Sequence, residues 1–442
     1  IVVGLSLVSM FGVSRAFGIP LLMGIAFGIS AMYLLLVAFK LVIMFRSLPA
    51  ERDVLTAEDL ATVTNEELPI VSVLIPLYKE QEIIPQIFRY LSDFDYPREK
   101  LDIIFILEST DTETAEAFLA MNPPSHFKAL LSPDVQPKTK PKAMNVAFGA
   151  AKGEILVIFD AEVLPERDQL KKAYLTFKRH PEAKYLHSRM DVYNADYNWI
   201  TRLYAGEFCY FYHFFLPGLV SSNYPIPISG HSTYFRREVI EKVGAWDAYN
   251  VAEDCDIGIR IYRKGFGSGR MLDTHTWEQS TTTVATWVRQ RTRWIQGFIQ
   301  TSIVQLRYPL LLKRELKTWR NFLIFLVLVP GNVVLNILNI VQWGMFVLWN
   351  VTHAPFLQVA YSGVTLYLAT ICFFFGNFFF TFYSMYSLYV RKHYRIVPWG
   401  LLMFAYWIML GIATIRATIH LFLHPHKWDK TSHPAIHVSK PS

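Results

Sequence analysis

The chain has 442 residues, of which 52% are hydrophobic, 15% aromatic and only 18% charged, a composition too apolar for an ordinary soluble enzyme. The formal net charge is +7, yet Lys and Arg form no long run, so we expect no nucleic-acid partner. Cys209, Cys255 and Cys372 are far apart and lack a C-x-x-C spacing, which indicates neither a disulfide framework nor a zinc site.

The first part of the chain is apolar. Residues 17–45 carry a single charge, Lys40, and as a helix they are long enough to cross a bilayer core of about 30 Å. Residues 1–13 are shorter and are interpreted either as the end of an earlier membrane span or as an interfacial helix. We therefore expect N-terminal transmembrane helices over residues 1–48, followed by a polar, acidic linker over residues 49–68.

From Pro69 onward, short apolar runs alternate with helical segments, a pattern typical of a parallel α/β sheet. We expect strands over residues 71–76, 101–107 and 154–159, and a helix over residues 82–94. Ligands of open α/β sheets bind at the carboxyl ends of the strands. Here all three strand ends are polar, which predicts a binding site: they read Leu77-Tyr78-Lys79-Glu80, Glu108-Ser109-Thr110-Asp111 and Asp160-Ala161-Glu162.

The third strand end carries two carboxylates, Asp160 and Glu162. Alternate residues of an extended segment point the same way, so both can face one divalent cation, and oxygen ligands of this kind suit Mg²⁺ or Mn²⁺ shared with phosphates. The basic run of residues 138–142 supplies positive charge for the same phosphates. The alternative for Asp160 and Glu162 is a solvated acidic turn without a metal. The chain lacks the G-x-x-x-x-G-K-[ST] and G-x-G-x-x-G loops, which disfavours a kinase, a P-loop NTPase and a dinucleotide-dependent enzyme.

A paired carboxylate, Glu253-Asp254, precedes a cationic and aromatic cluster at residues 290–294 by about forty residues. Asp254 is a candidate general base for glycosyl transfer from a nucleotide diphosphate, since a carboxylate takes up the acceptor proton as the new C–O bond forms. Burial that raises its pKa favours this role. The alternative is an N-cap for a helix over residues 255–264, and the two roles are compatible.

Two further segments are aromatic but keep scattered charges, residues 192–218 and 287–308. Trp and Tyr with charge suit helices in the membrane interface; for the first segment the alternative is an aromatic-rich core helix. Three long apolar blocks close the chain, and each is long enough to span a bilayer. They are residues 321–349, 356–388 and 396–423.

The basic group of residues 391–395 orients these blocks. By the positive-inside rule it is cytoplasmic, so the first two blocks form an out-and-back pair. The last block contains Arg416 and His420, and it is interpreted either as a single span or as a partly interfacial or hairpin segment. We expect membrane and interface helices over residues 321–423 and a short tail over residues 424–442.

Five motifs in order resemble those of the membrane-embedded family 2 glycosyltransferases with a GT-A fold, the group of the cellulose, curdlan, mannan, alginate and hyaluronan synthases. They are VSVLIPLYKE at residues 71–80, PKTKPKAMN at 137–145, the D-A-E triplet at 160–162, GHSTYFR with GAWDAYNVAED at 230–236 and 244–254, and QRTRW at 290–294. The resemblance covers nearly the whole chain. It implies an α/β GT-A catalytic domain with a mixed, mainly parallel sheet over residues 69–285, interface helices over residues 286–320, and transmembrane α-helices on both sides of a polytopic protein.

The resemblance also implies roles for individual residues. Asp254, with Glu253, is the catalytic base. The expected nucleotide-sugar-binding residues are Pro76, Tyr78, Glu80, Glu108, Lys142, Asp160, Gln290, Arg293 and Trp294. The expected acceptor-binding residues are Trp294, His231, Ser232 and Trp246, and the expected metal ligands are Asp160 and Glu162. Glu108 stands where the family usually has an aspartate that reads the base, so the nucleotide stays open.

By the same resemblance the chain is an inverting, metal-dependent, processive hexosyltransferase that polymerises a β-linked polysaccharide and passes it through the membrane. UDP-glucose is the first donor expected, and a GDP-sugar is the other. The Q-x-x-R-W motif also occurs in non-processive ceramide glucosyltransferases, so a single transfer to a lipid acceptor is the alternative. A membrane receptor or scaffold with a degenerate transferase domain is the alternative of another class, and the intact acidic and basic motifs disfavour it.

The partners implied are the nucleotide sugar, a growing glycan acceptor, the lipid bilayer and accessory export subunits. The location implied is the inner or plasma membrane of a bacterium, with several spans and a cytoplasmic catalytic domain.

Overall fold

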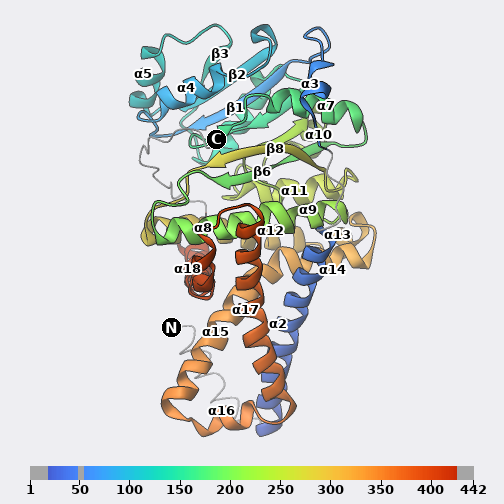
Figure 1. Cartoon of the computed structure of the whole chain (residues 1–442), viewed down its shortest axis with the longest axis vertical. Helices are drawn as coiled ribbons and strands as arrows, with labels where there is room; N and C mark the ends of the chain where they lie inside the picture. Colours follow the sequence, from blue (N-terminus) through green and yellow to red (C-terminus); the bar gives the residue numbers. More distant parts are fainter. Residues whose placement is uncertain (1–17, 48–53, 426–442) are drawn as a thin grey trace.

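The structure of the chain is a computed structural model that describes residues 18–47 and 54–425. The apolar segment of residues 1–13, the first part of the predicted linker and nearly all of the predicted tail lie outside the described residues. Figure 1 shows a sheet domain at one end of the molecule, a layer of helices beneath it, and long helices that extend away from this layer.

The sheet domain is built on one mixed sheet of eight strands in the order β3-β2-β1-β4-β7-β6-β8-β5. β1 to β4 are parallel where they pair, β6 is parallel to β8, and the remaining pairs are antiparallel. The strands are β1 (Val71–Leu77), β2 (Leu101–Glu108), β3 (Phe127–Ser132), β4 (Ile155–Ile158), β5 (Leu164–Pro165), β6 (Tyr185–Val192), β7 (Thr233–Arg236) and β8 (Arg270–Glu278). The mixed, mainly parallel sheet predicted from the sequence is therefore confirmed.

Helices cover both faces of this sheet, which explains why β1 and β2 are apolar on both sides. On one face, Val73 and Ile75 of β1 pack with α4, α5 and α7, and on the other face Leu74 packs with α6, α10 and α11. The bounds are α3 (Ala57–Ala61), α4 (Ile84–Ser92), a 3-10 turn (Arg98–Lys100), α5 (Thr112–Ala120), α6 (Lys140–Ala150), α7 (Gln169–Arg179), α10 (Arg237–Val243) and α11 (Glu253–Arg263).

A layer of helices lies between the sheet and the long helices (Figure 1). It consists of α8 (Trp199–Tyr210), a π-helical turn (Phe211–Phe215), α9 (Leu216–Ser221), α12 (Val284–Leu306), α13 (Pro309–Glu315) and α14 (Trp319–Leu328). α8 is buried along most of its length, with Tyr204 and Phe208 in the largest apolar core. The alternative of an aromatic-rich core helix therefore describes α8 better than a helix exposed in the membrane interface.

Four segments of the described chain are long and apolar enough to cross a membrane: Leu21–Ile43, Pro330–Thr352, Val364–Val390 and Val397–Leu423. The first three correspond to α2 (Ile19–Ser47), α15 (Pro330–Thr352) and α17 (Val364–Val390), and α16 (Pro355–Ala360) joins α15 to α17 at the end far from the sheet (Figure 1). The fourth contains a 3-10 turn (Val397–Leu402) and α18 (Met403–Leu423). The chain is thus a membrane protein with a sheet domain between apolar helices.

The last of these segments, α18, runs beside α12. Near its start, the Tyr406 hydroxyl accepts a hydrogen bond from Trp287 Nε1 of α12 at 2.8 Å. Just past its end, the His424 carbonyl accepts one from Gln296 Nε2 of the same helix at 3.2 Å. Both ends of α18 therefore lie against one helix beneath the sheet.

α12 approaches the start of α11 closely at Gly297. A Cβ atom on Gly297 would lie 2.1 Å from the Cβ of Ala252 and 2.7 Å from its backbone nitrogen. Because real Cβ atoms do not come this close to one another, only glycine allows α12 to pack against the residue that precedes Glu253.

We predict that Gly297→Ala separates α12 from α11 and destabilises the fold by about 1–3 kcal/mol, the cost of overpacking a filled core. The matched control is Gly149→Ala on α6, where a Cβ would meet nothing within 4 Å and the better helix propensity of alanine stabilises by up to about 1 kcal/mol. Unfolding of both variants in detergent measures the difference. Equal stability of the two would contradict the packing argument.

Candidate active site

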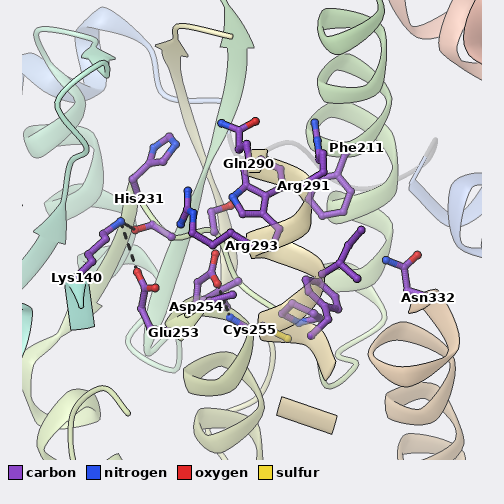
Figure 2. A pocket seen from close by; sticks show the side chains of 18 of the residues that line it. Lys140, Phe211, His231, Glu253, Asp254, Cys255, Gln290, Arg291, Arg293 and Asn332 are labelled. Atoms are coloured by element: carbon purple, nitrogen blue, oxygen red, sulfur yellow. Dashed lines mark hydrogen bonds and ion pairs between the residues drawn. The ribbon is translucent and has the colours of Figure 1, made fainter. Parts of the chain in front are cut away.

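A single cavity of about 930 Å³ begins at the carboxyl ends of β1, β2 and β4, passes the first turn of α11 and the middle of α12, and continues between α2, α15 and α17. Figure 2 shows Lys140, Glu253 and Asp254 toward one end and Asn332 toward the other. Most of the residues predicted for the site line this cavity: Pro76, Tyr78, Glu80, Glu108, Asp160, Glu162, His231, Glu253, Asp254, Gln290, Arg293 and Trp294.

Three predicted residues do not line it. Trp246 is 4% exposed and packs in the core edge-on against Phe148 and Phe235. Ser232 is buried at the start of β7, where its hydroxyl pairs with His231 Nδ1 at 3.1 Å. Both side chains therefore make contacts inside the protein, which does not favour the predicted contact with the acceptor.

Lys142 is the third. Its ammonium donates to the Pro133 carbonyl at 2.8 Å and lies 3.3 Å from the Glu108 carboxylate. Lys140 lines the cavity instead. Two residues apart on a helix point in nearly opposite directions, so the first turn of α6 presents Lys140 to the cavity and turns Lys142 away from it. Lys140 is therefore a second candidate for the phosphate-binding lysine, and the role of Lys142 stays a prediction.

Lys140 joins the two acidic parts of the site. Its Nζ lies 2.6 Å from Asp160 Oδ1 and 3.5 Å from Glu253 Oε1, and it also donates to the Gly230 carbonyl at 3.1 Å. Burial alone would lower the pKa of Lys140, but the charges of Asp160 and Glu253 outweigh it and hold that pKa above its ordinary value. The lysine is therefore a permanent cation at the end of β4.

Asp254 differs from these carboxylates because it lacks a direct lysine partner among the described residues. Burial, and then the negative charge of Glu253, raise the pKa of Asp254 to about 7. Asp254 lies inside the first turn of α11, whose N-cap is Ala252, so the N-cap alternative for Asp254 was wrong. A general base at neutral pH requires a pKa near 7, and the Asp254 carboxyl has this property.

Asp160 and Glu162 follow β4 directly and both line the cavity. Burial opposes ionisation of Asp160, but Lys140 and His231 keep the pKa of this carboxyl below its usual range, so it is ionised at neutral pH. Two carboxylates in the wall of one cavity are oxygen donors of the kind that a hard divalent cation shared with phosphates takes. This donor set therefore agrees with the predicted Mg²⁺ or Mn²⁺ ligands.

Sequence reasoning missed Glu278, which ends β8 and also lines the cavity. Its two oxygens bond to His231 Nε2 at 2.8 Å and to the Tyr204 hydroxyl at 2.8 Å. Burial alone would lower the pKa of His231, but Glu278 and Asp160 outweigh it and raise that pKa. His231 therefore holds its proton more readily than a free imidazole does, and Asp160 is one of the causes.

A second set of residues that the sequence did not reveal positions Trp294. Arg291 of α12 is buried and bonds to the Glu207 carboxylate of α8, and the Tyr406 hydroxyl of α18 donates to the same carboxylate at 2.6 Å. The Arg291 guanidinium lies over the Trp294 ring, 4.3 Å from its centre. The indole is therefore fixed from behind by a cation that is itself held by two other helices.

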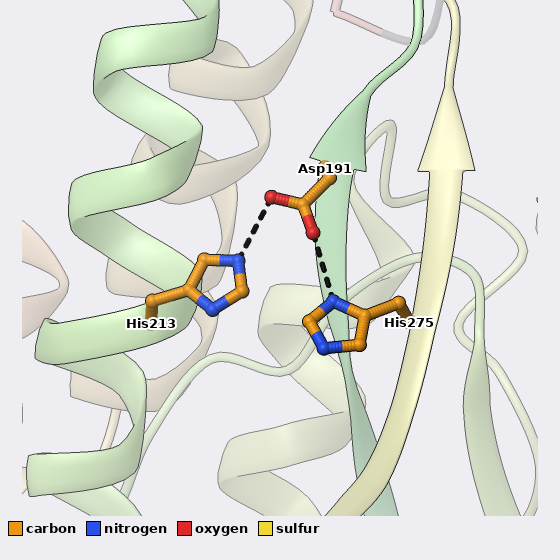
Figure 3. A group of neighbouring side chains, drawn as sticks. All are labelled: Asp191, His213 and His275. Carbon is orange, nitrogen blue, oxygen red and sulfur yellow. Dashed lines mark hydrogen bonds and ion pairs between the residues drawn. The ribbon is translucent and has the colours of Figure 1, made fainter. Parts of the chain in front are cut away.

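Outside the cavity, Asp191, His213 and His275 form a compact group whose potential ligand atoms lie within 4.8 Å of one another. Figure 3 shows the Asp191 carboxylate between the two imidazoles, 2.9 Å from His213 Nε2 and 2.8 Å from His275 Nδ1. Such a donor set can bind a transition metal, but the Arg391 guanidinium lies 3.2 Å from the same carboxylate and balances its charge. The group therefore ties β6, β8 and the π-helical turn to the end of α17.

Comparison with known proteins places this site in context. The sequence profile described as "Glycosyl transferase family group 2" matches residues 155–419. The "Probable glycosyltransferase YdaM" of Bacillus subtilis is 26% identical over 381 residues, which cover 85% of this chain and 89% of that protein. A "Beta-monoglucosyldiacylglycerol synthase" of Synechocystis sp. is 23% identical over 325 residues, covering 72% of this chain and 66% of that protein.

Among solved structures, the mannosyltransferase PcManGT from Pyrobaculum calidifontis, in complex with GDP-Man and Mn²⁺, superposes with a TM-score of 0.56. It is 19% identical, and the match covers 91% of this chain and 99% of that one. At this identity the likeness concerns the fold, and it extends over both the sheet domain and the apolar helices.

We predict that Glu207→Gln destabilises the protein by about 3–5 kcal/mol, because it leaves the buried Arg291 cation without its carboxylate. Unfolding by denaturant in detergent measures this loss. Glu238→Gln is the control: Glu238 pairs with Lys184 and Lys242 near the surface, and such pairs contribute about 0–1 kcal/mol. Similar losses in both variants would show that the Glu207–Arg291 pair has no special role.

Proposed function

The chain belongs to glycosyl transferase family group 2, as its motifs predicted, and from this premise we propose that it transfers one sugar from a nucleotide sugar to a membrane lipid with inversion at the anomeric carbon. The observation that carries this proposal is the single cavity, which connects the strand ends of the sheet to the space between the apolar helices. The nucleotide-sugar donor and the lipid acceptor can therefore occupy one cavity.

The donor half of the site supports a nucleotide diphosphate. Tyr78, Glu80 and Glu108 line the cavity at the ends of β1 and β2, where nucleotides bind in open α/β sheets. Lys140 and Arg293 bring positive charge to the neighbouring part of the same cavity. A divalent cation held by Asp160 and Glu162, either Mg²⁺ or Mn²⁺, would neutralise further charge on the departing diphosphate.

Chemically, the acceptor hydroxyl oxygen forms a bond to the anomeric carbon while the bond from that carbon to the diphosphate oxygen breaks. The hydroxyl proton passes to the Asp254 carboxylate, and the nucleoside diphosphate leaves with the electron pair. Burial beside Glu253 makes the Asp254 carboxylate more basic than an exposed aspartate. It can therefore accept this proton, and above about pH 7 most of it is ionised and ready to do so. One displacement of this kind inverts the anomeric configuration.

The far half of the cavity supports a lipid acceptor. Its walls there come from α2, α14, α15 and α17, and they combine apolar side chains, Leu328, Leu335 and Phe380 among them, with asparagines and Lys40. Relatives named as monoglucosyldiacylglycerol synthases add support for this class of acceptor. Processive polymer synthesis, which the Q-x-x-R-W motif favours, is the second candidate, because a cavity that continues between membrane helices also suits a growing glycan.

We also propose that the sheet domain faces the cytoplasm. The basic residues Arg391, Lys392 and Arg395 follow the end of α17 that is nearest to the sheet domain (Figure 1), and positive charge at the end of a span favours the cytoplasmic side. A cytoplasmic site has access to nucleotide sugars. The membrane would then be the inner or plasma membrane.

The purified protein in lipid vesicles, with labelled UDP- or GDP-sugars and Mg²⁺ or Mn²⁺, tests the proposal. Label that partitions into organic solvent as a single-sugar lipid supports it, and label in a high-molecular-weight polymer supports the second candidate. If the protein neither transfers nor hydrolyses any nucleotide sugar in the panel, both are wrong and a receptor or scaffold role stands.

We predict that Asp254→Asn lowers the rate of transfer by about 10²–10⁴-fold, the usual contribution of a general base, while the dissociation constant of the nucleotide sugar changes little. Single-turnover transfer and equilibrium binding measure the two quantities. Trp246→Phe is the control for disturbance of the neighbouring core, since Trp246 lies outside the cavity. Full transfer activity of Asp254→Asn would remove Asp254 from the mechanism.

The pKa of Asp254, raised to about 7, also predicts a pH dependence. Only the ionised carboxylate accepts a proton, so kcat/KM for the acceptor should fall about tenfold per pH unit below pH 7 and level off above it. Glu253 is one cause of the raised pKa, so Glu253→Gln should move the midpoint to lower pH. A pH profile of both proteins checks this, and an unchanged midpoint in the variant would contradict the assignment.

A further inference from the structure

The membrane end of the cavity contains one cation, Lys40 of α2. Its Nζ donates to Asn332 Oδ1 at 3.3 Å and lies 5.5 Å from the centre of the Phe380 ring. Among the described residues, no carboxylate forms an ion pair with it. Glu207, the acidic side chain in the same cavity wall, is already bonded to Arg291 and Tyr406.

The neighbouring face of α15 is polar where it meets the cavity. Asn332, Asn336 and Asn339 recur at i, i+4 and i+7, which places them on one side of the helix, and all three line the cavity. Asn336 is 9% exposed and Asn339 is 6% exposed, yet Asn336 Nδ2 and Asn339 Oδ1 have no hydrogen-bond partner in the protein.

Unpaired polar atoms and an unpaired cation are costly inside a membrane protein. A ligand that brings one negative charge and several acceptor oxygens would satisfy the Lys40 ammonium and Asn336 Nδ2, and a hydroxyl on the same ligand would donate to Asn339 Oδ1. A phosphate group has both properties, since a lysine ammonium binds it as a point charge and amide groups donate to its oxygens.

Depth in the bilayer decides which kind of phosphate fits. Lys40 lies six residues before Arg46, the basic residue at the end of α2, so it is about 9 Å farther along the helix at about 1.5 Å per residue. The cavity walls beside it include Leu335 and Phe380. A free phosphate ion gains nothing from such walls, whereas a lipid places its hydrocarbon against them and its headgroup at Lys40.

We propose that this end of the cavity binds the phosphate of an anionic phospholipid, whose headgroup hydroxyl is the acceptor directed toward Asp254. This inference rests on the proposed transfer to a lipid and names the chemical class of that lipid. Lys40 then distinguishes an anionic acceptor from a neutral glyceride, which offers a hydroxyl without the charge.

Binding in the absence of any nucleotide sugar tests this inference separately from catalysis. We expect native mass spectrometry of the full chain in detergent to show that phosphatidylglycerol binds at least about tenfold more tightly than diacylglycerol, the effect of one charge-assisted contact. Lys40→Met should remove this preference while the affinity for diacylglycerol stays unchanged. Lys40→Arg should retain it.

Lys313→Met is the matched control, because it removes the same charge from α13 outside the cavity and should leave the preference intact. Excess inorganic phosphate should not displace phosphatidylglycerol; displacement would show a site for free phosphate and overturn the lipid assignment. Equal affinities for the two lipids, or an unchanged preference in Lys40→Met, would also overturn it. Because no donor is present, these outcomes do not depend on whether transfer occurs.

Discussion

The contact between Gly297 and Ala252 is the constraint on which the site depends. It allows α12 to lie directly against the first turn of α11, so that Asp254 from one helix and Trp294 from the other line the same cavity. The two residues are forty positions apart in the sequence, and neither helix would bring them together alone.

The charged groups of the site are also arranged around the first turn of α11. Lys140 lies between Asp160 and Glu253 and balances much of their charge, while Asp254 sits beside Glu253 with no ammonium of its own. Two neighbouring carboxylates in a buried place do not ionise equally easily. Burial and the negative charge of Glu253 raise the pKa of the Asp254 carboxyl to about 7. Position relative to one lysine therefore gives adjacent acidic residues different chemistry.

Much of this arrangement is visible in the sequence, because apolar runs followed by polar residues fix both the strands and their ends. The strands expected over residues 71–76, 101–107 and 154–159 are β1, β2 and β4. The direction in which a helical side chain points depends on rotation about the helix axis, and the sequence did not predict it. Lys140 and Lys142 lie in one motif, and only the start of α6 at Lys140 decides which of them points into the cavity.

Hydrogen bonds between residues far apart in the sequence could not be predicted for a related reason. Glu207, Arg291 and Tyr406 come from three helices, and each alone reads as a scattered polar residue in an aromatic segment. Trp246 shows the converse, since a tryptophan within a recognisable motif looks functional from the sequence while the structure packs it against Phe148 and Phe235. Motifs locate a site, but the packing of helices decides which members of the motif reach it.

The two ends of the cavity differ in what each can admit. The end at β1, β2 and β4 is lined by charged and polar groups, whereas the end between α2, α15 and α17 is lined by apolar side chains with a few asparagines and Lys40. A charged nucleotide gains most at the first end and a lipid at the second, so under the proposed function neither ligand has to pass through the place of the other. Both can then be present when Asp254 takes up the proton. The polarity of the cavity wall thus orders the two substrates on opposite sides of Asp254, and a direct transfer without a glycosylated protein intermediate follows from that order.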